Sequence, residues 1–335
     1  MTTRLLTIIS GQPLPNYIAI NEIRPDVVHC IYTPQHGGMK KRLEDLKSVV
    51  QHNIPDVRFV THPIDNAYDS KGVWDLTVNL LTQHNKEDDD WMLNRSAGTE
   101  QMRGPLVAAF DNFYDDTLRG FFVETDRHRI SQMDDNWTPT YHPFLHDIGI
   151  QDYFALHGQT VTIGGTPDNN FEQRLLSELQ KLDFSEVMPD CKWMAKNETL
   201  AQYDTLATYK YQLFTFEVKQ IENATTTNLL DEFKDSEFVY DSKTRNFVHK
   251  DKNKVLVHDI EKLAYTRAIF GGPTGKAYWL MNGTFQPSAS IQERMKRLNI
   301  NSLIGGYTVA KELVKDPDKY GLPPLKPKAR KTQST

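Results

Sequence analysis

This sequence has few cysteines, a small net charge and no long apolar run. Only two of its 335 residues are cysteines, Cys30 and Cys191, which argues against a disulfide framework or a cysteine zinc site. The formal net charge of −5 excludes a basic coat, so any contact with nucleic acid must come from local patches. The apolar run from Leu5 to Ile9 is too short for a signal peptide or a membrane span. We therefore expect a cytoplasmic protein with no membrane partner.

The composition nevertheless supports well-packed cores. Hydrophobic residues make up 39% of the chain and aromatic residues 10%, which excludes wholesale disorder. Domains usually contain about 100–150 residues, so a chain of 335 residues is expected to form two. Four segments are predicted: a domain over residues 1–140, a connector over 141–190, a second domain over 191–315 and a disordered tail over 316–335.

The first half alternates short β-branched runs with amphipathic stretches. This alternation predicts an α/β fold with a parallel, Rossmann-like sheet that is covered on both faces. The acidic run at 87–90 is expected to be a solvated loop. The predicted strands are "RLLTIIS" (4–10), "DVVHCIYT" (26–33), "DVRFVTH" (56–62), "WMLN" (91–94) and "GFFVETD" (120–126).

The second half changes to an α+β pattern. An apolar hairpin is predicted over 203–220, and "CKWMAKNETL" (191–200) is expected to form a helix before it. A strand, a helix, the turn "GGPTG" and another strand follow from about residue 254. The tail "PPLKPKARKTQST" is rich in proline and lysine, which is typical of disorder.

Two loops follow the first and fourth predicted strands and form a candidate ligand site. In a doubly wound sheet the carboxyl ends of such strands line the ligand crevice, and free N–H groups at helix starts bind anions. By composition alone, both loops could equally be ordinary turns. The candidate residues are Ser10, Gly11, Gln12, Pro13 and Asn16 in the first loop, and Asn94, Gly98, Thr99 and Glu100 in the second.

The predicted hairpin carries an acid, a second acid and a lysine: Asp204, Glu217 and Lys219. Residues i and i+2 of a strand point to the same face, so Glu217 and Lys219 are expected side by side. Two carboxylates can bind Mg²⁺ or Mn²⁺ and activate water against a phosphodiester, while a lysine neutralises the developing charge. The alternative interpretation is an ordinary surface ion pair on a strand.

The first half resembles the CARF domain, the Rossmann-like sensor of cyclic oligoadenylates. That family carries N-x-T-G-G-T-K-x-M after its fourth strand, and Asn94, Gly98, Thr99 and Met102 fit this pattern. The stretch "FFVETDRHRI" (121–130) resembles the strand pair that follows. Ser96, Ala97 and Glu100 replace the first threonine, the first glycine and the lysine. Glu100 therefore removes a cation that would face ligand phosphates.

The second half resembles restriction-endonuclease-like domains through the D…E-x-K set at Asp204, Glu217 and Lys219 and a "GG" turn at 271–272. Residues 1 to about 310 are thus similar to the CARF–nuclease fusions of type III CRISPR defence. One departure is the missing glutamate of a W-L-E motif after Trp193, for which Glu198 could substitute.

The resemblance implies a homodimeric, metal-dependent endonuclease that is activated allosterically by cyclic tetra-adenylate and takes part in antiviral defence. Asp204, Glu217 and Lys219 would be catalytic, with Mg²⁺ or Mn²⁺ on Asp204 and Glu217. The loops at 10–16 and 94–102 would bind the messenger, and DNA, RNA or both would be cleaved. Two alternatives remain open: a sensor or regulator with an inactive C-terminal domain, and a ring nuclease that degrades its own messenger.

Overall fold

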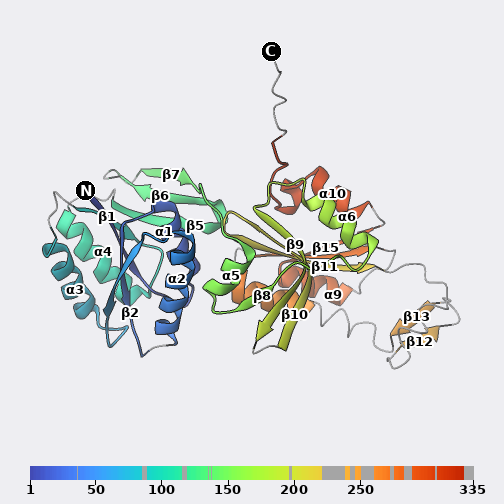
Figure 1. Ribbon diagram of the computed structural model, residues 1–335, viewed down its shortest axis with the longest axis horizontal. Coiled ribbons are helices and arrows are strands. Elements are labelled where there is room, and N and C mark those ends of the chain that lie inside the picture. Colours follow the sequence, from blue (N-terminus) through green and yellow to red (C-terminus); the bar gives the residue numbers. More distant parts are fainter. Residues whose placement is uncertain are drawn as a thin grey trace, which may run out of the picture. The chain divides into compact units, whose positions relative to one another are not determined.

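The computed structural model consists of two compact units, Met1–Thr160 and Val161–Thr335 (Figure 1). The connector predicted over 141–190 is divided between these units. No helix in the described part of the chain is long and apolar enough to cross a membrane. The described residues are 1–35, 37–84, 89–114, 119–134, 136, 138–195, 198–220, 238–241, 246–249, 260–271, 275–282, 289–305 and 308–327.

The N-terminal unit is built on a seven-stranded sheet in the order β3-β2-β1-β4-β5-β6-β7. Strands β1 to β5 pair in parallel, and β6 and β7 add an antiparallel edge. The order reverses between β1 and β4, as in Rossmann-like sheets, so the α/β prediction for this half is confirmed. The strands of this sheet are β1 (Thr2–Ile8), β2 (Val27–Tyr32), β3 (Arg58–Pro63), β4 (Asp89–Asn94), β5 (Gly120–Glu124), β6 (Arg129–Met133) and β7 (Pro139–Pro143). The short strand β8 (Thr160–Thr162) pairs in the other sheet.

Helices cover both faces of this sheet because the strands are apolar on both sides (Figure 1). Leu6, Ile8 and Ile31 pack with side chains of α3 and α4 on one face. Helices α1 and α2 lie on the opposite face (Figure 1). The bounds are α1 (Leu14–Ile23), α2 (Met39–Asn53), α3 (Ser70–Thr82), α4 (Glu100–Tyr114) and α5 (Ile150–Leu156), with a 3₁₀ turn at Thr125–Arg127.

The acidic run predicted as a solvated loop at 87–90 is partly a strand. Asp89 begins β4 and is only 5% exposed. Its carboxylate pairs with Arg4 at 2.7 Å and with His84 at 3.2 Å. The expectation was wrong for this residue because a half-buried arginine on the neighbouring strand compensates its charge, which sequence periodicity does not reveal.

We expect His29 to make the stability of the N-terminal unit sensitive to acid. Its side chain is buried beside Trp91, and its Nδ1 lies 3.1 Å from Nε2 of His62. Burial above all, helped by the charges of His62 and Arg4, lowers the pKa of His29 to about 3. In the unfolded chain this histidine has a pKa near 6.5, so between about pH 6.5 and pH 3 it is protonated in the unfolded chain but neutral in the folded one.

We expect this histidine to stabilise the fold fully above about pH 6.5 and to lose that contribution as the pH falls towards 3. Between pH 7 and pH 4 the loss should be about 3 kcal/mol. Urea unfolding of the wild type and of His29→Leu across this range checks the prediction. The wild-type curve should fall more steeply, and parallel curves would contradict it.

The C-terminal unit has a six-stranded mixed sheet in the order β15-β14-β11-β10-β9-β8. Phe214, Phe216 and Val218 on one face pack with helices α6 and α10. Trp279 on the other face packs with helical residues of 260–271 and with α9. The elements are α6 (Asn170–Leu179), β9 (Glu186–Ala195), β10 (Glu198–Tyr209), β11 (Gln212–Gln220), β12 (Phe238–Asp241), β13 (Asn246–His249), a helical segment over 260–271 that ends in a π-helix at Arg267–Gly271, β14 (Lys276–Asn282), α9 (Ala289–Arg297), β15 (Ile300–Gly305) and α10 (Val309–Lys315).

The described residues of the helix expected over 191–200 belong instead to two strands, β9, which ends at Ala195, and β10, which begins at Glu198. Cys191 and Trp193 are buried and their neighbours are more exposed, which is the two-residue period of a strand. The two strands pair antiparallel, with Trp193 opposite Ala201. The expectation of a helix was therefore wrong.

Part of the predicted tail packs against the C-terminal unit. Residues Asp318–Tyr320 form a 3₁₀ turn, Leu322 is buried, and Leu325 bridges to Leu182. Residues 328–335 lie outside the described part of the chain.

Candidate functional site

The hairpin of β10 and β11 brings Asp204 and Glu217 to adjoining strands. The pairing of these strands runs from Tyr209 opposite Gln212 to Thr205 opposite Phe216. Asp204 follows one residue beyond, and its Oδ2 accepts a hydrogen bond from the backbone N–H of Val218 at 2.5 Å. Thirteen positions of sequence separation thus become direct adjacency.

The burial pattern of β11 explains why Glu217 faces away from the aromatic core. Phe214, Phe216 and Val218 alternate into the core under α6 and α10. Glu217 lies between them in the alternation, opposite Trp279 in β14, and is only 2% exposed. A carboxylate this buried needs compensating partners. The hairpin therefore holds Glu217 in a site that is almost inaccessible to solvent.

The compensating partner of Glu217 is Lys262, which sequence reasoning missed. Its Nζ forms an ion pair with Glu217 Oε2 and donates a hydrogen bond to the backbone oxygen of Gln202 at 2.9 Å. The lysine side chain is 15% exposed. Lys262 lies one helical turn before Thr266 and shares its buried face, but nothing in the local sequence marks it as the partner of a buried acid.

The third carboxylate suggested by the sequence does not reach this site. Glu198 is exposed and begins β10, six residues before Asp204, about 20 Å along an extended strand. Glu172, on α6, is a nearer acid. Burial raises its pKa, and the charge of Glu217 adds to the increase.

Glu172 also has a structural role. Its Oε2 accepts a hydrogen bond from the N–H of Asp168 at 2.8 Å, and Asn169 caps the same helix through the N–H groups of Phe171 and Glu172. This is a variant of the capping box in which Glu172 accepts from the residue before the N-cap, and its Asn-x-x-Glu spacing can be seen in the sequence. Its contacts account for Glu172 as part of the helix start.

The donor set at the hairpin fits a hard divalent cation. No group of three or more His, Cys, Asp or Glu side chains that could hold a metal occurs among the described residues. Mg²⁺, however, is commonly bound through one or two carboxylates, with waters and substrate phosphate completing the shell. Asp204 and Glu217 meet that requirement. Lys219 lies opposite Met281 in the pairing of β11 with β14, and its side chain is outside the described part.

The two candidate ligand loops lie at the switch point of the N-terminal sheet. Strands β1 and β4 are parallel neighbours, and helices α1 and α4 leave their carboxyl ends in turn. The strand order reverses here, which is where doubly wound sheets bind ligands. The fold thus brings together residues 10–16 and 94–100.

Three of the predicted ligand residues are buried. Asn16 donates to Thr7 Oγ1 at 2.7 Å and to the backbone oxygen of Ile8 at 2.8 Å. Asn94 donates to the same Thr7 hydroxyl at 3.1 Å and accepts from the N–H of Ser96. These amides tie the two loops to β1. Pro13, also buried, precedes the first turn of α1.

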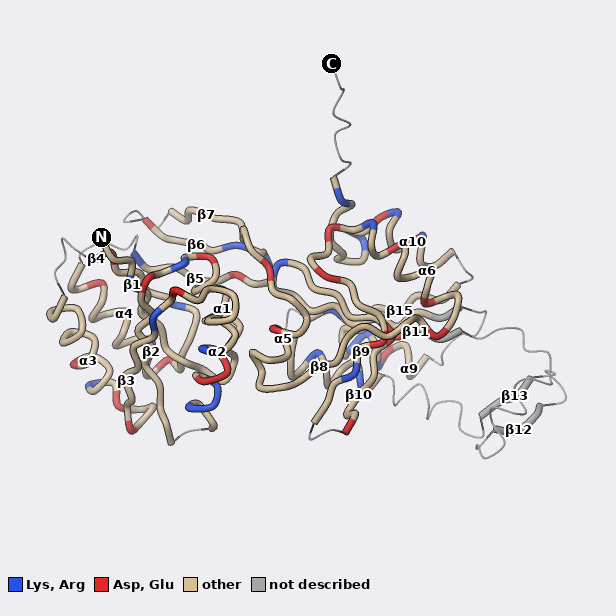
Figure 2. Tube along the Cα trace, in the orientation of Figure 1, with Lys and Arg blue, Asp and Glu red and all other residues tan. Residues whose placement is uncertain are grey.

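The remaining loop residues line the surface. Gly11, Gln12, Thr99 and Glu100 are exposed, and Ser10 and Gly98 are half-buried. The nearby cations are engaged, because Arg103 pairs with Glu100 and Arg95 pairs with Asp111 at 2.5 Å. Acidic and basic positions are also intermixed along both units (Figure 2).

Gly98 is required by the fold itself, whether or not a ligand binds beside it. Its φ is +98°, and a Cβ there would lie 2.8 Å from Ile8 Cδ1 in the core. Gly98→Ala is therefore expected to destabilise the N-terminal unit by about 2–4 kcal/mol through strain and overpacking. Urea unfolding checks this, with Gly11→Ala as control, since nothing lies within 4 Å of that Cβ. Equal stability of the two variants would contradict it.

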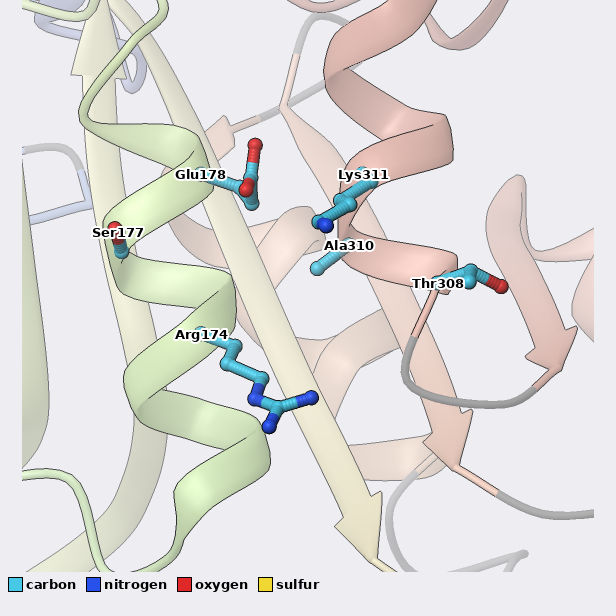
Figure 3. Close-up of a pocket in the computed structure, with 6 residues that line it drawn as sticks. All are labelled: Arg174, Ser177, Glu178, Thr308, Ala310 and Lys311. Carbon is cyan, nitrogen blue, oxygen red and sulfur yellow. The ribbon is translucent and has the colours of Figure 1, made fainter.

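A separate cavity of about 340 Å³ lies between α6 and α10 (Figure 3). Arg174 and Glu178 project from α6, and Lys311 from α10 (Figure 3). Glu178 also pairs with Lys181 at 2.6 Å. None of the predicted site residues lines this cavity; its lining is Arg174, Ser177, Glu178, Thr308, Ala310 and Lys311.

Solved structures share this arrangement over nearly the whole chain. Can2 from Sulfobacillus thermosulfidooxidans, solved in complex with cyclic tetra-adenylate, matches with a TM-score of 0.69 and 13% identity, over 95% of this chain and 99% of Can2. Protein VC1899 from Vibrio cholerae matches with a TM-score of 0.66 and 11% identity, over 95% and 98% of the two chains. No family model and no curated protein sequence matches.

A third similar structure is a type III CRISPR defence DNA nuclease activated by cyclic oligoadenylate. Its TM-score is 0.61 at 14% identity, and the match covers 96% of this chain but only 51% of the nuclease. At these identities the likeness establishes the fold. This chain therefore has the two-unit α/β fold of these proteins, with a Rossmann-like N-terminal unit.

Proposed function

We propose that this chain is a metal-dependent endonuclease activated by a cyclic oligoadenylate, cyclic tetra-adenylate in the first instance, in type III CRISPR defence. The observation that carries the proposal is the juxtaposition of Asp204 and Glu217, fixed by the bond from Val218 N to Asp204 Oδ2. The fold shared with Can2 in complex with cyclic tetra-adenylate and with a cyclic-oligoadenylate-activated nuclease supports it.

The C-terminal unit would act as a restriction-endonuclease-like domain. Asp204 and Glu217 would hold Mg²⁺ or Mn²⁺, which when bound lowers the pKa of water and polarises a phosphodiester. The buried position of Glu217 excludes bulk water and strengthens its interaction with cations. Lys219 is proposed to orient the attacking water or to neutralise charge on the phosphate.

The N-terminal unit would act as the sensor. The exposed part of the switch-point crevice, from Ser10 to Gln12 and from Gly98 to Glu100, is the proposed messenger surface. The N-terminus of α4 at this crevice supplies N–H groups suited to phosphate, whereas Pro13 and Pro15 at the start of α1 have no N–H. A cyclic ligand with internal symmetry suits a two-fold axis, so we propose a homodimer.

Incubation with Mn²⁺, end-labelled DNA or RNA and cyclic tetra-adenylate tests the proposal, provided that polymer and messenger are both followed by chromatography. We expect the labelled polymer to be shortened only when the messenger is present. Degradation of the messenger with intact polymer would identify a ring nuclease instead. Binding of the messenger without cleavage of either molecule would identify a sensor with an inactive C-terminal domain.

A further inference from the structure

Lys262 contacts the candidate metal-binding acid although it belongs to a different element. Its ammonium forms the ion pair with Glu217 and the 2.9 Å bond to Gln202 O, so two of its three donors are committed at β11 and β10. The ammonium also lies 5.8 Å from the ring centroid of Tyr203. These contacts place a fixed positive charge where a divalent cation would bind.

The helix that carries Lys262 is held in place by hydrogen bonds and by buried side chains. Thr266 Oγ1 lies 2.7 Å from the hydroxyl of Tyr203 and donates to the backbone oxygen of Lys262 at 2.8 Å. Ile260 and Leu263 are fully buried on either side of the lysine. The helix therefore delivers the ammonium to Glu217 as a rigid part of the core.

The ion pair with Lys262 compensates the charge of the buried Glu217. Burying a negatively charged carboxylate that is 2% exposed costs free energy unless a cation accompanies it. A metal would supply that cation in the loaded enzyme, and Lys262 supplies it in the metal-free protein. The same lysine then repels a divalent ion that approaches the same carboxylate.

We propose that Lys262 is a built-in counter-cation of Glu217, a positioning residue that stabilises the metal-free site and weakens its affinity for divalent ions. The inference rests on the proposed metal site at Asp204 and Glu217. Its consequence is that entry of an anionic phosphate, which offsets the repulsion between lysine and metal, favours metal binding. Metal and substrate would thereby load the site together.

The test is Mn²⁺ binding, measured by electron paramagnetic resonance or calorimetry without substrate. Lys262→Met should bind Mn²⁺ about tenfold more tightly than the wild type, because one positive charge is removed from the site. The same variant without metal should unfold at a lower temperature, and Mn²⁺ should restore more of its stability than it adds to the wild type.

Lys311→Met is the matched control, because it removes an exposed lysine from α10 on the opposite side of the sheet. It should leave Mn²⁺ affinity unchanged. Lys262→Arg keeps the charge and should keep the weak wild-type affinity, so the comparison with the wild type survives even if the methionine variant does not fold. Tighter Mn²⁺ binding by the arginine variant would overturn the proposal.

Two failures can be told apart. If Glu217→Gln binds Mn²⁺ as the wild type does, the proposed metal site is wrong. If Glu217→Gln loses Mn²⁺ but Lys262→Met binds it no more tightly than the wild type, the metal site stands and the role of Lys262 is wrong.

Discussion

Glu217→Gln is expected to reduce messenger-stimulated cleavage by about 1,000-fold or more. The substitution keeps the size and the burial of the side chain but removes the negative charge that would bind the metal. The loss of a metal that activates water and polarises the phosphate is worth several kcal/mol, and each 1.4 kcal/mol is a factor of ten in rate. Initial rates on a labelled strand with Mn²⁺ measure the effect. Asp204→Asn should behave similarly.

The chain provides a matched control for this result. Glu198→Gln removes an exposed carboxylate at the start of the same hairpin, six residues from Asp204. It should leave the cleavage rate unchanged. Both variants should bind cyclic tetra-adenylate as the wild type does, since the proposed messenger site belongs to the other unit. Full activity of Glu217→Gln would remove Glu217 from the catalytic site.

Cyclic tetra-adenylate is expected to raise the cleavage rate about 100-fold. A shift from about 1% to about 99% active protein requires the messenger to prefer the active arrangement by about 10⁴-fold. The proposed messenger surface and the acids belong to different units, and we expect the messenger to act through differential affinity for two arrangements of the protein. Titration of the messenger against initial rate gives both the affinity and the amplitude.

Two substitutions in the loops sharpen this test. Gly11→Leu adds bulk at an exposed position whose Cβ meets nothing within 4 Å, so it should weaken messenger binding without destabilising the fold. Glu100→Lys removes an acid and releases Arg103 from its ion pair, so it should tighten binding without changing the saturated rate. Calorimetry measures both. Unchanged affinity in both variants would contradict this placement of the messenger.

The sequence predicted the fold where local patterns and tertiary environment agree. Alternating apolar runs and turn residues identified β1 to β5, and the alternation of Phe214, Phe216 and Val218 identified β11 as a central strand. The strand at 191–195 was missed because Cys191 and Trp193 alternate for only two buried positions. Periodicity over so short a run does not distinguish a strand from a helix.

The site could be predicted only in part, for a related reason. Strand spacing indicated Asp204 and Glu217, because a hairpin converts sequence separation into adjacency. Lys262 is 45 residues from Glu217, and nothing local marks it as the partner of a buried acid. Asn16 and Asn94 were expected at the ligand surface, but each is buried against Thr7, through the packing of α1 on β1 for Asn16 and of β4 beside β1 for Asn94.

The most direct test of ligand-gated, metal-dependent cleavage is the initial rate on a labelled strand under four conditions, with Mn²⁺ or excess EDTA and with or without cyclic tetra-adenylate. Rapid cleavage is expected only when Mn²⁺ and the messenger are present together. Cleavage that persists in EDTA would contradict a metal site at Asp204 and Glu217, and equal rates with and without the messenger would contradict control by the N-terminal unit.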